Sequence, residues 1–489
     1  MSTIKRIAKN AGVTFIGDNL LKILSTILVI FIARYLGDVE YGKFAFALSF
    51  TGLFFILMDL GTRILIVREI AQNRKEASKI VANVLMLKFL SSIFVYVLIL
   101  VSAYGLKYNT ETIIAIAIAA AGLVFDSLSM TVGSIFQAFE RLEIPAIMRT
   151  IRIAVRLAVT LPLLISGSNF LTILLVYAAV QFLDFMVSMF ICYKRFVALA
   201  FDFDKKLILQ LLKKSFPFLL SGIFVTVYFR IDITLMSKLA PASLLGIYDS
   251  VSRDAVIGWY SSAYNLLDAA TSIAVAVSAS ILPVAIVYFH ESKEKLLKLY
   301  SLSIRFLTYL SIPIAVGTTL LADKIILLLY GSAYANAALA LRILVWTLIP
   351  LCINYIMGAT MIAIHKEKEG MYILFLNAVV NIILNLLLIP KYSLYGAAIA
   401  TVLTEIFYFS GYYYIMSRHI GRLDMLGLVL KPLIASLIMG MVIYYSINLN
   451  VIVLVALGAL VYSACMYMLK AVNEEEMALI RKIFIEKKK

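Results

Sequence analysis

Three arginines lie in one apolar stretch, residues 147–165, with the sequence IMRTIRIAVRLAVTLPLLI. At 3.6 residues per helical turn, Arg149, Arg152 and Arg156 fall on one face, within about 60° of each other. A lone arginine near the centre of a bilayer costs about 2.5 to 3.5 kcal/mol. A membrane helix with this stripe therefore turns it toward a wet cavity or toward acidic partners.

The chemistry that such a stripe could perform is anion binding. Guanidinium groups bind phosphate bidentately and stay charged at every relevant pH, so arginines suit a phosphate or a diphosphate. Two alternatives stay open. Arg149 lies near the helix end and could snorkel to the interface. Arg152 and Arg156 could instead pair with Asp126 or Asp184.

A weak internal repeat gives this helix a counterpart. The segment that contains it aligns without gaps with a segment beginning at residue 358. In this register Asn377 lies opposite Arg152, and Asn381 lies opposite Arg156. The counterpart helix therefore carries an amide face, which suits sugar hydroxyls; helix packing is the alternative interpretation.

Other polar side chains within apolar segments complete the candidates. Phosphate binding is assigned to Arg149, Arg152, Arg156 and Arg230, sugar binding to Asn377, Asn381, Tyr228 and Tyr264, and ion coupling to Asp18, Asp232, Asp268 and Glu405. Two of the acidic residues have a basic neighbour one turn away: Asp18 with Lys22, and Asp59 with Arg63. Cysteines and histidines lie singly, so we predict no disulfide, no metal site and no cofactor.

The elements that position these residues follow from composition. The chain has 489 residues, of which 63% are hydrophobic and only 15% charged, and its mean hydropathy is +0.98. These values indicate an integral, all-α membrane protein. The net charge of +16 comes from lysines and arginines in alternate loops, which argues against a nucleic-acid partner.

About fourteen apolar runs are long enough to span a bilayer. The basic residues gather in every second break, which predicts that these breaks and both termini are cytoplasmic. The first run is too long for a signal peptide and is read as an uncleaved span. The expected spans are residues 13–36, 43–67, 81–104, 112–137, 144–166, 170–192, 215–239, 257–289, 302–327, 338–364, 370–390, 395–416, 428–447 and 451–470.

The span order suggests four regions. Residues 1–192 form an N-lobe of six helices, 193–214 a cytoplasmic linker and 215–416 a C-lobe of six helices. Residues 417–489 add a peripheral helix pair and a basic cytoplasmic tail. Within the linker, DKKLILQLLKKSF has an amphipathic pattern with a basic face, which suits either an interfacial helix or a solvated connection.

Five stretches resemble a known family. They are ARYLGDVEYGKFAFALSF (33–50), MDLGTRILIVREIA (58–71), IGWYSSAYNLLDA (257–269), LYGSAYANAALALRIL (329–344) and LLLIPKYSLYGAAIATVLTE (386–405). Together they resemble the polysaccharide-exporter branch of the multidrug/oligosaccharidyl-lipid/polysaccharide flippase superfamily. The resemblance implies fourteen helices in two pseudo-symmetric lobes, a central cavity and alternating access. Related lipid-linked precursor flippases have a cationic cavity, which fits Arg152, Arg156 and Arg230.

From the resemblance we expect a flippase in the cell membrane, and not an enzyme. It would move a lipid-linked oligosaccharide, a polyprenyl-phosphate or polyprenyl-diphosphate sugar, from the inner to the outer leaflet for surface polysaccharide or glycan assembly. The expected partners are membrane lipid, the lipid-linked glycan, and glycosyltransferases or a polymerase of the same pathway.

Two other classes of protein are alternatives to a flippase. A drug or cation antiporter of the same superfamily predicts an acidic cavity lining, against which the arginine stripe counts. A membrane glycosyltransferase could use Asp38 and Glu40 to hold a divalent metal, but their loop has only about six residues and no large extracellular domain accompanies it. The sequence contains no phosphate-cradling glycine loop, so it gives no indication of an ATP-driven pump.

Overall fold

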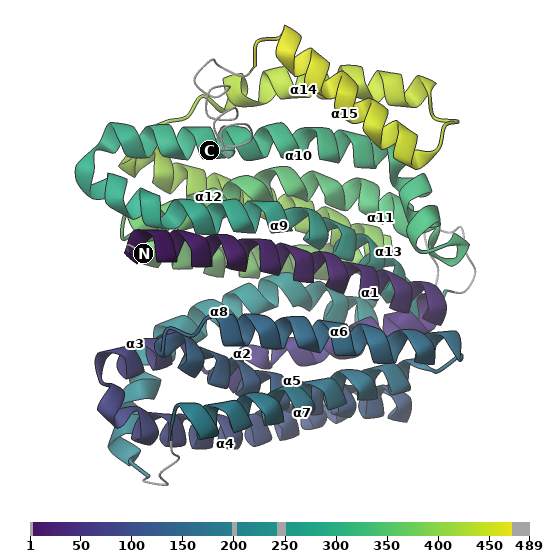
Figure 1. Cartoon of the computed structure of the whole chain (residues 1–489). Coiled ribbons are helices and arrows are strands. Elements are labelled where there is room, and N and C mark those ends of the chain that lie inside the picture. Colours follow the sequence, from purple (N-terminus) through teal and green to yellow (C-terminus); the bar gives the residue numbers. More distant parts are fainter. Residues whose placement is uncertain (1–2, 198–202, 242–250, 472–489) are drawn as a thin grey trace. The chain divides into compact units, whose positions relative to one another are not determined.

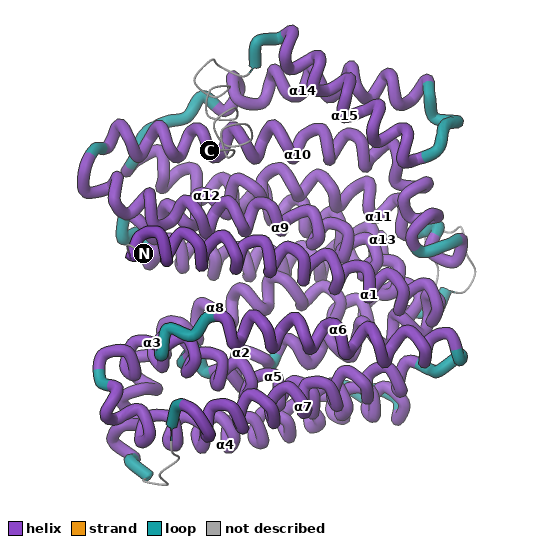
Figure 2. The backbone as a smooth tube through the Cα atoms, viewed as in Figure 1, coloured by secondary structure: helices purple, strands orange, loops and turns teal. Residues whose placement is uncertain are grey.

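The structure is a computed structural model that describes residues 3–197, 203–241 and 251–471. Side chains are described from Leu21 onward, those of Ile64 and Lys75 excepted. Within these ranges the chain is helical and contains no strand, which confirms the all-α prediction (Figure 2). The α-helices are α1 (Thr3–Leu53), α2 (Phe55–Asp59), α3 (Arg63–Gln72), α4 (Ala77–Gly105), α5 (Thr110–Ala138), α6 (Glu143–Ile165), α7 (Phe170–Arg195), α8 (Lys205–Leu239), α9 (Arg253–Glu291), α10 (Lys293–Leu329), α11 (Ala337–Leu344), α12 (Leu348–Ala363), α13 (Glu367–His419), α14 (Met425–Tyr445) and α15 (Val451–Met468).

Most of the predicted spans coincide with one helix each. Ten helical segments of the described chain are long and apolar enough to cross a membrane. Helix α13 contains two predicted spans, and α1 contains the first predicted span and the start of the second. The helical conformation of α1 is interrupted at Gly37, with φ 78°, and that of α13 at Ser393, with φ 54°.

The second predicted span, residues 43–67, is broken where the sequence pattern is continuous. Helix α2 ends at Asp59, and α3 begins at Arg63. Between them Leu60 and Gly61 have φ values of 54° and 64°, a left-handed conformation. A Cβ atom at Gly61 would lie 2.7 Å from the backbone nitrogen of Leu219 on α8, so both the conformation and the close approach require glycine.

The described chain packs as two compact units, and their boundaries fall inside α9 and α13. One unit comprises Met1–Ala269 and Leu374–Ala400, and the other comprises Ala270–Ile373 and Thr401–Lys489. In the first unit α5 packs against α4 and α7, and α6 packs against α1 and α7 (Figure 1). In the second unit α14 and α15 pack on α10 through a core that includes Val316, Met439 and Leu454.

The amphipathic stretch of the predicted linker is helical, but it is not a separate element. It forms the start of α8 and runs without interruption into the seventh predicted span. Leu211 is buried in an apolar cluster with residues of α3, α4 and α5. Asp204 caps this helix and pairs with Lys79 at 2.7 Å; this contact and the amides of Leu207 and Lys206 lower the pKa of Asp204. Residues 198–202 of the linker lie outside the described chain.

Helices α1 and α9 cross at two glycines in the first unit. A Cβ atom at Gly42 would lie 1.7 Å from the carbonyl oxygen of Asp254. A Cβ atom at Gly258 would lie 2.1 Å from the carbonyl oxygen of Asp38. The two backbones can approach this closely only because both positions lack a side chain, as is common between membrane helices.

Candidate functional site

Arg152 lies at the centre of a polar network between α5, α6 and α7. Its Nη1 atom donates to Asp126 Oδ1 at 2.8 Å and to Gln181 Oε1 at 2.9 Å. Asp184 Oδ2 lies 3.8 Å from the same nitrogen and accepts a hydrogen bond from Ser129. The sequence left open whether Arg152 pairs with Asp126 or Asp184; the structure brings both carboxylates to it.

Arg156 lies one turn further along α6 and contacts an aromatic ring. Its guanidinium carbon is 4.2 Å from the ring centroid of Tyr177 on α7, a cation–π contact. The Nε atom is enclosed and has no hydrogen-bond partner among the described residues. Arg156 is therefore held by stacking, and one of its buried donors stays unsatisfied.

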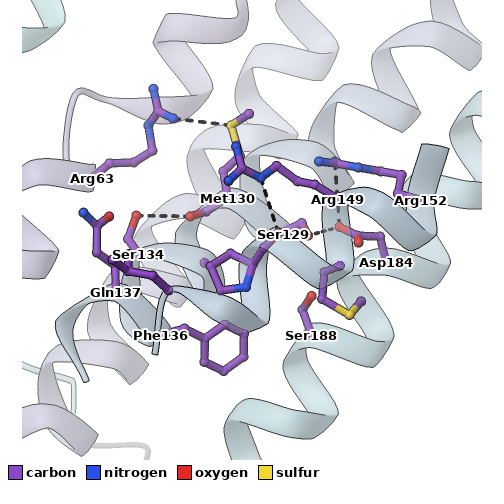
Figure 3. A pocket seen from close by; sticks show the side chains of 14 residues that line it. Arg63, Ser129, Met130, Ser134, Phe136, Gln137, Arg149, Arg152, Asp184 and Ser188 are labelled. Carbon is purple, nitrogen blue, oxygen red and sulfur yellow. Dashed lines mark hydrogen bonds and ion pairs between the residues drawn. The ribbon is translucent and has the colours of Figure 1, made fainter. Parts of the chain in front are cut away.

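A cavity of about 330 Å³ opens beside this network (Figure 3). Arg149 and Arg152 line it, and Arg156 does not. Figure 3 shows Arg149 extending toward Met130 and Arg152 extending toward Asp184. The lining residues are Arg63, Ser129, Met130, Gly133, Ser134, Phe136, Gln137, Leu142, Pro145, Met148, Arg149, Arg152, Asp184 and Ser188.

One side of the cavity contains an ion cluster that the sequence predicted only in part. The expected pair of Asp59 and Arg63 is confirmed, with 3.3 Å between Arg63 Nε and Asp59 Oδ1. The fully buried Lys88 of α4 lies 2.9 Å from the same oxygen and also donates to the Asp59 carbonyl. Sequence reasoning missed Lys88, although a lone lysine in an apolar span is itself a signal of an internal partner.

Arg230 and its neighbours on α8 lie elsewhere in the first unit. The side chain of Arg230 is exposed and runs close to Gly52 of α1, where a Cβ atom would lie 2.9 Å from it. Tyr228 is buried against Phe229. Asp232 is buried and accepts hydrogen bonds from the Tyr260 hydroxyl and from the Ile233 amide. None of these residues lines the cavity beside α6.

Tyr264 and Asp268 lie on α9. The ring of Tyr264 is 5.8 Å from that of Tyr260. Asp268 forms an ion pair with Lys22 of α1. The sequence offered Asp18 as the partner of Lys22, but the side chain of Asp18 lies outside the described part of the chain.

The asparagines predicted to contact sugar face the interior of the first unit. Asn377, Asn381 and Asn385 are all buried and follow one another at four-residue intervals on α13. Asn385 donates to the Asn381 carbonyl at 2.9 Å and to its side-chain oxygen at 3.1 Å. Neither polar atom of the Asn377 side chain has a hydrogen-bond partner among the described residues. Sequence reasoning missed Asn385, whose spacing would have revealed it.

Glu405 is buried in the second unit. Asn354 of α12 donates to its Oε2 atom at 2.7 Å. On the same face of α13, the hydroxyl of Tyr408 donates to that of Tyr412 at 2.7 Å. Polar side chains thus follow one another along this face, two of them linked by a hydrogen bond.

Glu40, a candidate metal ligand in the glycosyltransferase alternative, pairs with a lysine side chain. Lys43 donates to it at 2.9 Å and to Glu111 at 2.9 Å. Asp38 accepts a hydrogen bond from the amide of Val39 at 3.0 Å.

The long apolar helices of the described chain are those of a multi-pass membrane protein, and three arginines line its cavity beside α6. The chain belongs to the polysaccharide biosynthesis protein family, whose model matches residues 7–289. The model of the lipid II flippase MurJ matches residues 182–463. These matches confirm the resemblance inferred from the sequence.

Two relatives illustrate the similarity. A lipid II flippase MurJ from Bacillus subtilis is 26% identical over 54% of this chain, and the match spans 52% of that relative. A capsular polysaccharide biosynthesis protein, CapF, from Staphylococcus aureus is 22% identical over 84% of this chain and 99% of its own length.

Solved structures share the fold. A lipid II flippase MurJ in an inward closed conformation matches 94% of this chain and 98% of its own, with 18% identity and a TM-score of 0.77. An inward-facing multidrug resistance MATE transporter matches 81% of this chain and 94% of its own, with 16% identity and a TM-score of 0.62.

Proposed function

We propose that this membrane protein is a flippase for a lipid-linked oligosaccharide, a polyprenyl-phosphate or polyprenyl-diphosphate sugar. The headgroup would pass from the inner to the outer leaflet of the cell membrane, for surface polysaccharide or glycan assembly. The observation that carries the proposal is the arginine-lined cavity beside α6. The names of its relatives, a lipid II flippase and a capsular polysaccharide biosynthesis protein, support the substrate class.

The proposed architecture has fourteen spans with both termini cytoplasmic. Interruptions of α1 at Gly37 and of α13 at Ser393 support it, since α13 then supplies two spans, and α1 supplies one span and the start of the next. Helix α6 is long enough to cross but carries three arginines on one face. The lobes would be residues 1–192 and 215–416, joined by 193–214 and followed by the pair in 417–489, and transport would proceed by rocking of the lobes.

The proposed roles divide by chemistry. Arg149 and Arg152 line the cavity, which supports phosphate binding by the α6 face, with Arg149 in direct contact and Arg152 in the wall beside Asp126 and Asp184. Arg156 would join if it left the Tyr177 ring. Arg230 is exposed and would meet a phosphate elsewhere on the path. Sugar would contact Asn377, Asn381, Tyr228 and Tyr264 only in a conformation that uncovers the buried members of this set. Candidate coupling groups stay Asp18, Asp232, Asp268 and Glu405.

The alternative of a drug or cation antiporter rests on the shared fold alone. The MATE transporter is only 16% identical, and a likeness of this kind carries no substrate. The proposed partners are membrane lipid, the lipid-linked glycan, and glycosyltransferases or a polymerase of the same pathway.

The first test replaces Arg152→Ala together with Arg156→Ala in a strain that depends on this protein. We expect loss of surface glycan when variant and parent are compared at matched protein abundance, because Arg152 no longer holds Asp126 and Asp184 in the cavity wall and Arg156 no longer contributes its charge to the α6 face. The readouts are surface glycan and membrane protein abundance. The matched control is Arg141→Ala, since Arg141 is exposed and pairs with Glu143, two residues further along the chain, at 3.1 Å. Normal surface glycan in the double variant would contradict a role of Arg152 and Arg156 in transport.

A further inference from the structure

Arg63 lines the same cavity as Arg149, although the two residues come from different helices. Arg63 is the first residue of α3, and Arg149 lies in α6. Figure 3 shows both side chains extending toward Met130, and Arg63 Nη1 lies 3.5 Å from the Met130 sulfur. We propose that Arg63 and Arg149 are the two guanidinium groups that hold a diphosphate headgroup, and that Asp59 and Lys88 position Arg63. This inference rests on the proposed flippase function.

The charge of Arg152 is already balanced. Two carboxylates, those of Asp126 and Asp184, lie within 3.8 Å of its Nη1 atom, and Gln181 accepts a further hydrogen bond from it. A phosphate that took Arg152 would leave these partly or fully buried carboxylates without their cation, which is costly in a medium of low polarity. Arg152 therefore forms the wall of the cavity, and the attraction for an anion must come from other cations.

Arg63 retains an uncompensated charge because Asp59 is shared. Lys88 is fully buried and lies 2.9 Å from Asp59 Oδ1, whereas Arg63 reaches the same oxygen at 3.3 Å through Nε. An enclosed ammonium group requires a counter-ion. The single negative charge of Asp59 therefore neutralises Lys88 and does not also neutralise Arg63. The contact through Nε orients the guanidinium group, whose terminal nitrogens face the cavity side, where Nη1 meets only the weakly accepting sulfur of Met130 among the contacts described.

The break in the second span places this guanidinium group. Because the helical conformation stops at Leu60 and Gly61, the chain restarts at Thr62 and Arg63 in a new direction. Arg63 is thus the first residue of α3 and lies at the cavity. A continuous helix would have extended the line of α2 through this position.

The size and the lining of the cavity limit what it can hold. A volume of about 330 Å³ lies at the small end of ligand sites, which cover ~300–1,000 Å³. Hydroxyl and amide groups of Ser134, Ser188 and Gln137 join the arginines in the lining. Such a site accommodates a charged headgroup, while the remaining sugars and the lipid chain stay outside it.

The test measures binding of farnesyl diphosphate to the full-length protein in nanodiscs. We expect Arg63→Gln to weaken binding about ten-fold or more, since it removes charge-assisted hydrogen bonds to phosphate. Arg63→Lys should give an intermediate affinity, because lysine keeps the charge but loses the bidentate geometry. The matched control is Arg74→Gln, an exposed arginine paired with Glu140 at 3.1 Å, which should bind as the parent chain does.

Inorganic pyrophosphate, tested in parallel, distinguishes a lipid headgroup from a free anion. Binding of farnesyl diphosphate that depends on both Arg63 and Arg149 supports the proposal. Binding of pyrophosphate alone overturns the lipid headgroup as the ligand. Loss of binding in Arg149→Gln but not in Arg63→Gln overturns the arginine pair and leaves the flippase proposal intact. Failure of the flippase proposal would appear separately, as normal surface glycan in cells from which this protein has been deleted.

Discussion

Lys88 shows how a buried charge is accommodated at the scale of single residues. Its ammonium group contacts both the carboxylate and the main-chain carbonyl of Asp59, and no part of the side chain is exposed. Removing one partner of such a pair leaves the other charge uncompensated, which typically costs about 3 to 5 kcal/mol. The cost of removing either partner therefore comes from the charge that is left unpaired in the interior.

We predict that Lys88→Met lowers thermal stability markedly, because Asp59 would then have only the more distant Arg63 as its partner. The measurement is the unfolding temperature of the purified protein in detergent. Lys295→Met is the control, since Lys295 in the first turn of α10 is exposed and pairs with Glu291, the last residue of α9. Equal unfolding temperatures for the two variants would show that Lys88 carries no structural charge pair.

Residue types predicted the site in outline. The one-sided spacing of Arg149, Arg152 and Arg156 required internal partners, and the structure supplies Asp126, Asp184 and Tyr177. Spacing along one helix also predicted the contact between Asp59 and Arg63. The role of Lys88 depends on how α4 packs against α2. Packing between two helices cannot be predicted from the spacing of residues along one sequence.

At the scale of elements, the crossing of α1 and α9 depends on glycine. Gly42 and Gly258 each face a carbonyl oxygen of the other helix at a distance that no Cβ atom can occupy. The sequence predicts a loop of about six residues with Asp38 and Glu40 between the first two spans, and Gly37 does interrupt α1 there. Gly42 has a second role that a turn pattern cannot reveal, because close packing depends on the partner helix.

We predict that Gly258→Ala destabilises the protein by about 1 to 3 kcal/mol or more, since overpacking forces the two backbones apart. Gly105→Ala is the control, because a Cβ atom at Gly105 meets no other atom within 4 Å. Protein yield and unfolding temperature in detergent measure the effect. A Gly258 variant as stable as the control would argue against a tight crossing.

At the scale of the whole molecule, periodicity and hydropathy predicted the all-α class and the positions of most of the long apolar helices. Expected spans such as 112–137 and 144–166 match α5 and α6 within two residues. Agreement is good because a span must satisfy its own backbone within the bilayer, so its length is a local property. The break at Leu60 could not be predicted in this way, since it is stabilised by contacts with other helices.

The orientation of the molecule is testable with single cysteines. In a chain whose Cys192, Cys352 and Cys465 are replaced by alanine, we introduce Arg141→Cys between α5 and α6 or Ser168→Cys between α6 and α7. The distribution of basic residues predicts that a membrane-impermeant maleimide labels position 168 on intact cells. Position 141 should react only after permeabilisation. The reverse pattern would contradict cytoplasmic termini.

The interruption at Leu60 and Gly61 has a mechanical consequence. Asp59, at the end of α2, is fastened to α4 through two oxygens, whereas Arg63 starts α3 beyond two residues of left-handed conformation. The break thus separates α2, which is held by Lys88, from α3, which is joined to it through the left-handed residues Leu60 and Gly61. An anion bound to Arg63 would turn α3 relative to α2, which Lys88 holds in place. Helix α3, which carries the contact to the ligand, would therefore be the first element to respond when the cavity is occupied.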